Sequence, residues 1–213
     1  MPRFKFVPGR GYKRDNRDKK LKARTSSRVY RYWTDHQWFG DQKDTPHCVG
    51  FGWAHWLHAA PVVNYIDPHG IYRYAKYVDE WQGEDYEGTS VRAGAKVLHH
   101  MGFIESYAFT RDLDTLIYTL LEVGPVVIGV DWYQGFMRSD THGVIKLEGD
   151  LLGGHCCMLT GVNVIDRMFR GKNSWGEDYG VLGRFWLSFD DMKKLMRDKG
   201  EVCCAIERKG APQ

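Results

Sequence analysis

The feature that most constrains the fold of this chain is a change in sequence texture at Gly124-Pro125, near its middle. Before this point, the apolar segments are long enough for helices and are followed by helix-ending residues. After it, short β-branched and aromatic segments alternate with Gly and Asp turns, which is typical of strands. Helices that precede strands favour an α+β fold with a helical part and a separate sheet part.

The boundaries of these elements follow from capping residues and breakers. Predicted helices cover 48–60, about 90–101, about 113–123 and 190–199. Pro61 ends the first helix, Gly102 forms the C-cap of the second, and Asp112 is the expected N-cap of the third. Ser188 or Asp190 would cap the last. Predicted strands cover 126–130, 155–164, 168–175, 183–188 and 202–207.

Composition supports a globular protein. The 213 residues are 43% hydrophobic and 14% aromatic, which is enough to build a core. No segment approaches the roughly 20 uncharged apolar residues that would span a bilayer, and no secretory signal is seen. There are five cysteines, and four of them form two adjacent pairs: Cys48, Cys156, Cys157, Cys203 and Cys204. This pattern is not a secreted disulfide framework, so we expect a reducing compartment.

Residues 1–28 form a basic arm, with eleven Lys or Arg residues against two Asp residues. The remaining 29–213 are mildly acidic and are expected to be one domain. The arm lacks apolar periodicity, which predicts a flexible or extended segment. Three interpretations stay open: a solvated tail or one that lies on the acidic domain, a contact with nucleic acid or another acidic partner, and a short pro-segment.

Cys48 is predicted to lie in the first turn of its helix. Free N–H groups and the positive end of the helix dipole favour the thiolate there, and a thiolate is a nucleophile for acyl carbons. Such a nucleophile needs a base, a group that orients the base, and donors for an oxyanion. The sequence offers candidate side chains for these parts in Gln42, His155 and Asn173.

Three local motifs surround these residues. Gln42 lies six residues before Cys48, Gly153-Gly154-His155 opens a predicted strand, and Lys172-Asn173-Ser174-Trp175-Gly176 follows. Together they resemble the papain-like (C1) cysteine peptidases. The resemblance implies a two-lobe fold, with a helical lobe over about 29–123 and an antiparallel β-barrel lobe over about 124–213. The active site would lie in the cleft between the lobes, and no cofactor or metal would be required.

The resemblance also implies a role for each matched residue. Gln42 and the Cys48 N–H would form the oxyanion hole, and His155 would act as base and then as acid. Trp175 would shield the bond between His155 and Asn173 from water. An extended peptide substrate would contact the backbone of Gly88 and Thr89, and also Gly154 and Trp175.

The chain departs from the secreted members of that family. Cys48 is followed by Val49 rather than by an aromatic residue, the motif's upstream cysteine is missing, and His155 follows after only 107 residues. These departures resemble a compact bacterial or phage branch, for which a cytoplasmic or virion-associated location is expected.

Alternatives remain at this level. An alignment that places Gly52 at the nucleophile position would make the protein catalytically silent, but Gln42 would then lie ten residues away instead of six. A papain-fold protein that serves only in binding or structure is a second possibility. A thiol transpeptidase, or an amidase for a non-protein amide, is a third. Trp132, Tyr133 and Phe136 fit either the wall of a substrate cleft or simple packing.

Overall fold

The computed structural model describes residues 6–13, 25–81 and 86–207. Its helices are α1 (Cys48–His58), α2 (Pro68–Val78), α3 (Val91–His100), α4 (Leu113–Glu122) and α5 (Phe189–Asp198), with a 3-10 turn at Gln134–Met137. Its strands are β1 (Tyr30–Tyr32), β2 (Ile104–Thr110), β3 (Val126–Tyr133), β4 (Leu151–Asn163), β5 (Met168–Lys172), β6 (Arg184–Ser188) and β7 (Glu201–Glu207). The predicted α+β class is therefore confirmed.

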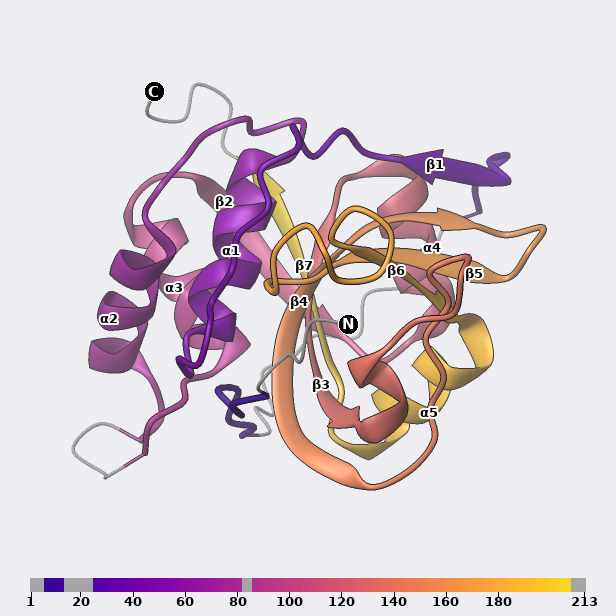
Figure 1. The fold of residues 1–213 in the computed structure, drawn as a ribbon. Helices are drawn as coiled ribbons and strands as arrows, with labels where there is room; N and C mark the ends of the chain where they lie inside the picture. Colours follow the sequence, from indigo (N-terminus) through magenta and orange to yellow (C-terminus); the bar gives the residue numbers. More distant parts are fainter. Residues whose placement is uncertain (1–5, 14–24, 82–85, 208–213) are drawn as a thin grey trace.

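One antiparallel sheet runs through the molecule in the order β2-β7-β3-β4-β5-β6, and β1 pairs with β4 as well. Helices α1, α2 and α3 gather on one side of this sheet, whereas α4 and α5 lie on the other (Figure 1). The predicted β-barrel is not closed: within the described residues, β2 and β6 are the two ends of the sheet. Strands β1 and β2, which come from the mainly helical first half of the chain, also belong to this sheet.

Two hydrophobic cores share the central strands. One lies among α1, α3 and the sheet, and the other lies on the side of α4, α5 and β6. Neighbouring residues of a strand point to opposite faces, so Cys156 enters the first core and Cys157 the second. Cys203 and Cys204 divide in the same way. This confirms that these cysteines pack in the protein interior, and none of them forms a disulfide.

Side-chain caps explain most helix boundaries. Asp112 accepts the Thr115 N–H at the start of α4, and Ser188 accepts the Asp191 N–H at the start of α5. Three elements were not predicted from the sequence: α2, β1 and β2. For α2 a usable signal existed, because Asp67 caps the helix and Pro68 occupies its first turn.

A buried ionic cluster fixes the segment before α1 to the strands β5 and β6. Asp35 accepts two hydrogen bonds from Arg184, at 2.8 and 2.5 Å, and its carboxylate lies 3.5 Å from the Lys172 amine. Burial opposes ionisation of Asp35, but Arg184 and Lys172 hold its pKa down at about 2. Lys172 directly precedes Asn173, so this cluster also anchors the chain beside a predicted catalytic residue.

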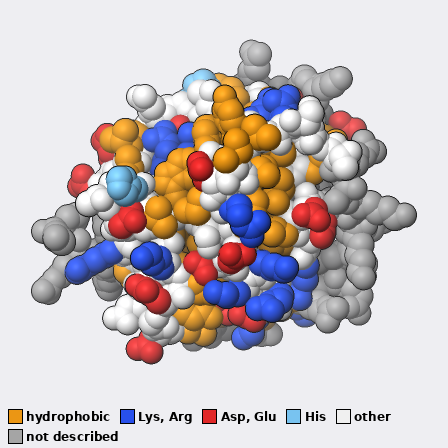
Figure 2. All heavy atoms as spheres, turned by 90° about the vertical axis from the view of Figure 1, so that its right-hand side faces the viewer, with side chains coloured by type: hydrophobic (Ala, Val, Ile, Leu, Met, Phe, Trp, Pro, Cys, Tyr) orange, Lys and Arg blue, Asp and Glu red, His pale blue; other side chains and the backbone are white. Residues whose placement is uncertain are grey.

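The face that carries β1, β5, β6 and α5 mixes apolar side chains with charges of both signs (Figure 2). That face is therefore not a uniformly basic surface. Among the described residues, no helix has the length and apolarity needed to cross a membrane.

Candidate active site

Cys48 begins α1, as predicted, and is fully buried. The backbone N–H groups of Cys156, Val49 and Gly9 point at its sulfur. Cys156 directly follows His155, so the sulfur lies beside the strand that carries the predicted base. Burial nevertheless raises the pKa of the Cys48 thiol to about 12, against these N–H groups. These N–H groups favour the thiolate, as expected, but desolvation outweighs them in this arrangement.

His155 and Asn173 are joined by a hydrogen bond of 2.8 Å between Nε2 and Oδ1. The backbone N–H of Ser174 donates to the same oxygen at 2.8 Å, which fixes the orientation of the Asn173 amide. Since Oδ1 only accepts, Nε2 of His155 must carry the proton. Nδ1 then bears a lone pair, and it has no hydrogen-bond partner among the described residues. This is the tautomer that a base requires.

Aromatic rings enclose His155. Trp132 meets the imidazole edge-on with ring centres 4.6 Å apart, and Trp175 lies 5.2 Å away. Burial lowers the pKa of His155 to about 4, although its hydrogen bond to Asn173 acts in the opposite direction. With a neutral thiol and a neutral imidazole, the site is in a resting protonation state. Trp132 and Phe136 are buried, so these two aromatic residues pack in the core.

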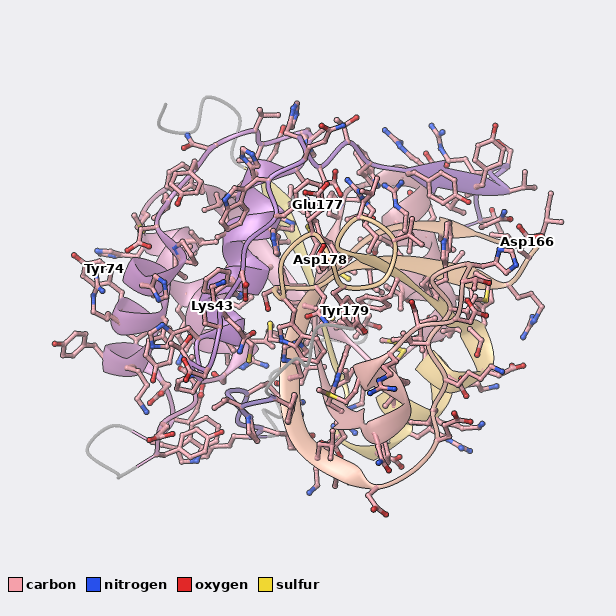
Figure 3. All side chains as sticks on the ribbon, in the orientation of Figure 1. Lys43, Tyr74, Asp166, Glu177, Asp178 and Tyr179 are labelled. Carbon is pink, nitrogen blue, oxygen red and sulfur yellow. The ribbon has the colours of Figure 1, made fainter. Side chains whose placement is uncertain are left out.

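Tyr179 supports this wall from the loop between β5 and β6 (Figure 3). Its ring meets Trp175 edge-on at 4.9 Å, and its hydroxyl donates to the Phe136 carbonyl at 2.7 Å. Trp175 is therefore held in place from behind while it covers His155. No role for Tyr179 was predicted, since an aromatic residue in a glycine-rich loop carries no signal of its own.

Gln42 is buried and connects the two sides of the site. Its Oε1 accepts from the Ser174 hydroxyl at 2.6 Å, and its Nε2 donates to the Thr45 carbonyl at 2.8 Å. Its backbone N–H also donates to the Ser174 carbonyl at 2.8 Å. An amide nitrogen has two N–H groups, so one remains for an oxyanion. Gln42 is thus held by Ser174, the residue that directly follows Asn173.

Part of the basic arm lies in this site. The Thr89 N–H donates to the Gly9 carbonyl, and the Gly11 N–H donates to the Thr89 carbonyl, both at 2.9 Å. On the other side, the Gly9 N–H donates to the Gly154 carbonyl at 3.2 Å. Three of the four residues predicted to bind substrate, Gly88, Thr89 and Gly154, therefore contact residues 9–11 of the same chain.

The fourth residue, Trp175, meets the ring of Phe6 at 6.1 Å, and Phe6 also lies 5.8 Å from the His155 ring. Residues 9–11 are buried, so this part of the arm lies on the domain, which is one of the interpretations that the sequence left open. Residues 1–5 and 14–24 of the arm lie outside the described residues. A contact between residue 9 and residue 89 leaves no periodic signal in a sequence, so the sequence could not locate the arm.

Gly52, the alternative nucleophile position, faces β4. A Cβ at this position would lie 2.8 Å from the Cys156 sulfur. Helix α1 therefore approaches the sheet closely at Gly52, and this position serves packing. That placement supports the assignment of Cys48 rather than residue 52 as the nucleophile position.

Comparisons with known proteins give a consistent fold. The solved structure of xylellain, a cysteine protease from Xylella fastidiosa, superimposes with a TM-score of 0.76 at 19% identity and covers 98% of this chain and 99% of that chain. Procathepsin L 3 from Tenebrio molitor larval midgut gives a TM-score of 0.64 at 12% identity, covering 93% of this chain and 75% of that one. The chain has the fold of papain-like cysteine proteases.

A sequence relative agrees with this fold. An uncharacterized peptidase C1-like protein from Acanthamoeba polyphaga mimivirus is 27% identical over 122 residues. The match covers 55% of this chain, and the chain spans only 39% of that relative. A scan against protein-family models found no match.

Proposed function

We propose that the protein is a papain-like cysteine peptidase, with Cys48 as nucleophile, His155 as base and acid, and Asn173 as the residue that orients His155. The observation that carries the proposal is the pair of hydrogen bonds on Asn173 Oδ1. Together they leave His155 with a free Nδ1 lone pair next to the strand segment that contacts the Cys48 sulfur. The fold and the C1-like relative support the same activity.

The reaction begins when His155 Nδ1 takes the thiol proton and the Cys48 sulfur attacks the carbonyl carbon of a peptide bond. The second Nε2–H of Gln42 and the Cys48 N–H stabilise the resulting oxyanion. The C–N bond then breaks, and the imidazolium gives its proton to the leaving amine. In the second half, His155 removes a proton from water, the hydroxide attacks the thioester, and the carboxylic acid leaves as the thiol is restored.

Covalent labelling tests the proposal directly. A fluorescent peptide with an electrophilic ketone should modify Cys48, as located by peptide mass spectrometry, and Cys48→Ala should abolish labelling and hydrolysis. His155→Ala should reduce kcat/KM by at least about 100-fold, which is the usual contribution of a general base. Cys156→Ala is the matched control, because it removes a buried thiol beside the site and should leave the label in place. If Cys48 stays unlabelled at pH 7 both in the natural chain and in a folded variant that releases residues 9–11 from the site, the proposal is refuted.

One observation favours a second candidate, a catalytically silent papain-fold protein. Residues 9–11 fill the site, and burial keeps Cys48 in its thiol form. The labelling experiment separates the two candidates. Product analysis with an added amine distinguishes simple hydrolysis, including that of isopeptide bonds, from transfer of the acyl group to an acceptor other than water.

A further inference from the structure

The arm lies in the site in an orientation that prevents its own cleavage. The carbonyl oxygen of Gly9 bonds to Thr89, whereas the Gly9 N–H faces the Cys48 sulfur and the Gly154 carbonyl. A nucleophile attacks a carbonyl carbon from above or below the amide plane. A sulfur that accepts the Gly9 N–H lies near the edge of that plane, so it is not placed to attack the Pro8–Gly9 bond. A Cβ on residue 9 would lie 3.0 Å from the Cys48 sulfur and would clash with the Pro46 carbonyl. Glycine is required for this close passage.

The next residue of the arm, Arg10, sends its side chain into an acidic pocket. Its guanidinium donates to the Glu201 carboxylate at 3.1 and 3.3 Å and lies 3.7 Å from the Asp131 carboxylate. It also donates to the Lys199 carbonyl. The Arg10 side chain is only 1% exposed, which is rare for arginine. The pocket therefore places an acidic or carbonyl oxygen near each of the three guanidinium nitrogens.

The walls of this pocket are shaped for a long, unbranched side chain. A Cβ at residue 129 would lie 2.7 Å from Arg10 Nε, and a Cβ at residue 154 would lie 3.2 Å from Arg10 Cδ. Both positions are glycine, so the stem of Arg10 lies directly against the backbone of the paired strands β3 and β4. A cavity of about 370 Å³ continues outward from Arg10 past Trp81 and Tyr86.

We propose that this pocket selects an arginine or lysine side chain of the peptide substrate, and that Arg10 occupies it in the resting protein. The proposal rests on the peptidase function above, and it adds a substrate class and an internal competitor. Its basis is geometric: the pocket opens beside Thr89 and Gly154, whose backbone groups hold the extended chain next to Cys48. A substrate bound to the same groups would place one of its side chains where Arg10 now lies.

The charges of the pocket explain why a neutral side chain would replace the cationic side chain of Arg10 poorly. Burial raises the pKa of Glu201 to about 7, while Arg10 and, more weakly, Arg92 favour its ionised form and Glu80 opposes it. If Arg10 leaves and an apolar side chain enters, Glu201 and Asp131 lose their nearest cation. A buried carboxylate without a partner is costly, so the empty pocket favours a cation.

The specificity test uses the full chain with Arg10→Ala, which frees the pocket. Internally quenched peptides carry arginine, lysine, citrulline or norleucine at each position from the fourth residue before the cleaved bond to the second after it. Citrulline matches the shape of arginine without its charge. At one position, arginine should exceed citrulline in kcat/KM by at least about 30-fold, because an interfacial charge would otherwise lose its partner.

Pocket variants locate the source of that preference. Glu201→Gln in the same background should reduce the ratio of arginine to citrulline to about threefold or less, while cleavage of the citrulline peptide continues. Asp131→Asn should reduce it less, because Asp131 is farther away and 16% exposed. Asp190→Asn, an exposed carboxylate on α5, is the control and should leave the ratio unchanged. If Glu201→Gln does not fold, Asp131→Asn still tests the pocket, because its partly exposed side chain is easier to replace.

Occupancy by Arg10 is tested with iodoacetamide, a small electrophile that has no side chain for the pocket. Cys48 should be alkylated faster in Arg10→Ala than in the natural chain, by about tenfold, with Arg10→Lys in between. A synthetic peptide with the sequence of residues 6–13 should inhibit Arg10→Ala, and the same peptide with alanine for its arginine should inhibit much less.

The outcomes separate the two proposals. Cleavage of peptides with an arginine-to-citrulline ratio near one at every position would overturn the pocket assignment and leave the peptidase intact. The pocket assignment would also be overturned if the arginine-to-citrulline ratio stayed unchanged in both Glu201→Gln and Asp131→Asn. A folded Arg10→Ala chain that neither cleaves peptides nor reacts at Cys48 would instead refute the peptidase function.

Discussion

Two buried ionic clusters lie on opposite sides of the candidate active site, and their acidic residues behave differently. Asp35 is held by Arg184 and Lys172, both of which belong to the folded domain, and its pKa falls to about 2. The Glu201 side chain is as little exposed, but its nearest cation is Arg10 of the arm, and burial raises its pKa to about 7.

The difference lies in desolvation and in the origin of the partners. Arg184 and Lys172 of the domain overcome the burial of Asp35, whereas Arg10 of the arm, aided weakly by Arg92, does not overcome the stronger desolvation of Glu201. The first cluster is therefore a permanent part of the fold, whereas the second is suited to exchange one cation for another. Predictions on stability and reactivity follow from this contrast.

The largest expected effect belongs to the permanent cluster. Asp35→Asn leaves Lys172 and Arg184 without their carboxylate in the interior and should reduce the free energy of unfolding by about 3 to 5 kcal/mol. Urea denaturation followed by tryptophan fluorescence measures this. Asp190→Asn, in which an exposed carboxylate is lost, is the control and should unfold like the natural chain. A loss below about 1 kcal/mol for Asp35→Asn would show that the cluster is not a structural anchor.

The two clusters should respond to pH with opposite signs. Glu201 has a higher pKa in the folded state than its ordinary 4.5, so the folded chain binds more protons between pH 4.5 and 7. The unfolding free energy of the natural chain, relative to Glu201→Gln, should thus fall by about 1 to 3 kcal/mol as pH rises through that window.

Asp35 has a lowered pKa, so its contribution is present above its ordinary value of 3.8 and is lost as pH falls toward 2. The lowered pKa of His155 makes stability rise with pH between about 4 and 6.5 and partly masks the Glu201 trend in the natural chain. Urea titrations of matched variants over pH 3 to 8 cancel the His155 contribution. If the difference in unfolding free energy between the natural chain and Glu201→Gln does not change with pH, the contrast between the two clusters is contradicted.

Lys172→Met should have an intermediate effect. The substitution removes an amine whose pKa burial lowers to about 8, while Asp35 keeps both hydrogen bonds from Arg184. We expect a loss of about 1 to 2 kcal/mol, together with a rise in the Asp35 pKa that NMR titration of its carboxyl carbon would detect. If the Asp35 pKa stays at its present value, Arg184 alone accounts for it.

Glu201→Gln should change stability least. At pH 7 the loss of one Arg10 partner is offset by removal of a poorly solvated carboxylate, so the net change should stay below about 1 kcal/mol. Its effect should appear instead in reactivity, as faster alkylation of Cys48 by iodoacetamide once the arm is held less tightly. A large destabilisation without faster alkylation would mean that both clusters are structural.

The sequence predicted those parts of the molecule that depend on local signals. Asp112 and Ser188 mark helix starts by their capping oxygens, and the alternation of a strand divides Cys156 from Cys157 between two cores. Helix α2 also had a local signal, Asp67-Pro68, which was not used.

Other features depend on residues that meet only in the folded state. The high pKa of Cys48 arises from everything that covers it, including Gly9, and no local pattern encodes that cover. The pocket for Arg10 likewise combines residues 10, 131, 199 and 201, which the sheet brings together from three distant segments. The motif spacing indicated the chemistry of the site, whereas its occupant and its acidic pocket required the fold.

The long strand β4 also determines when the residues of the site come together during folding. The proposed nucleophile lies on α1, and its proposed base lies 107 residues later on β4, which itself pairs with β1 between Tyr30 and Asn163. Contacts this distant in sequence form slowly and late in folding. A partly synthesised chain therefore carries the thiol without its base, and we expect that proteolytic activity appears only when the last strands have joined the sheet.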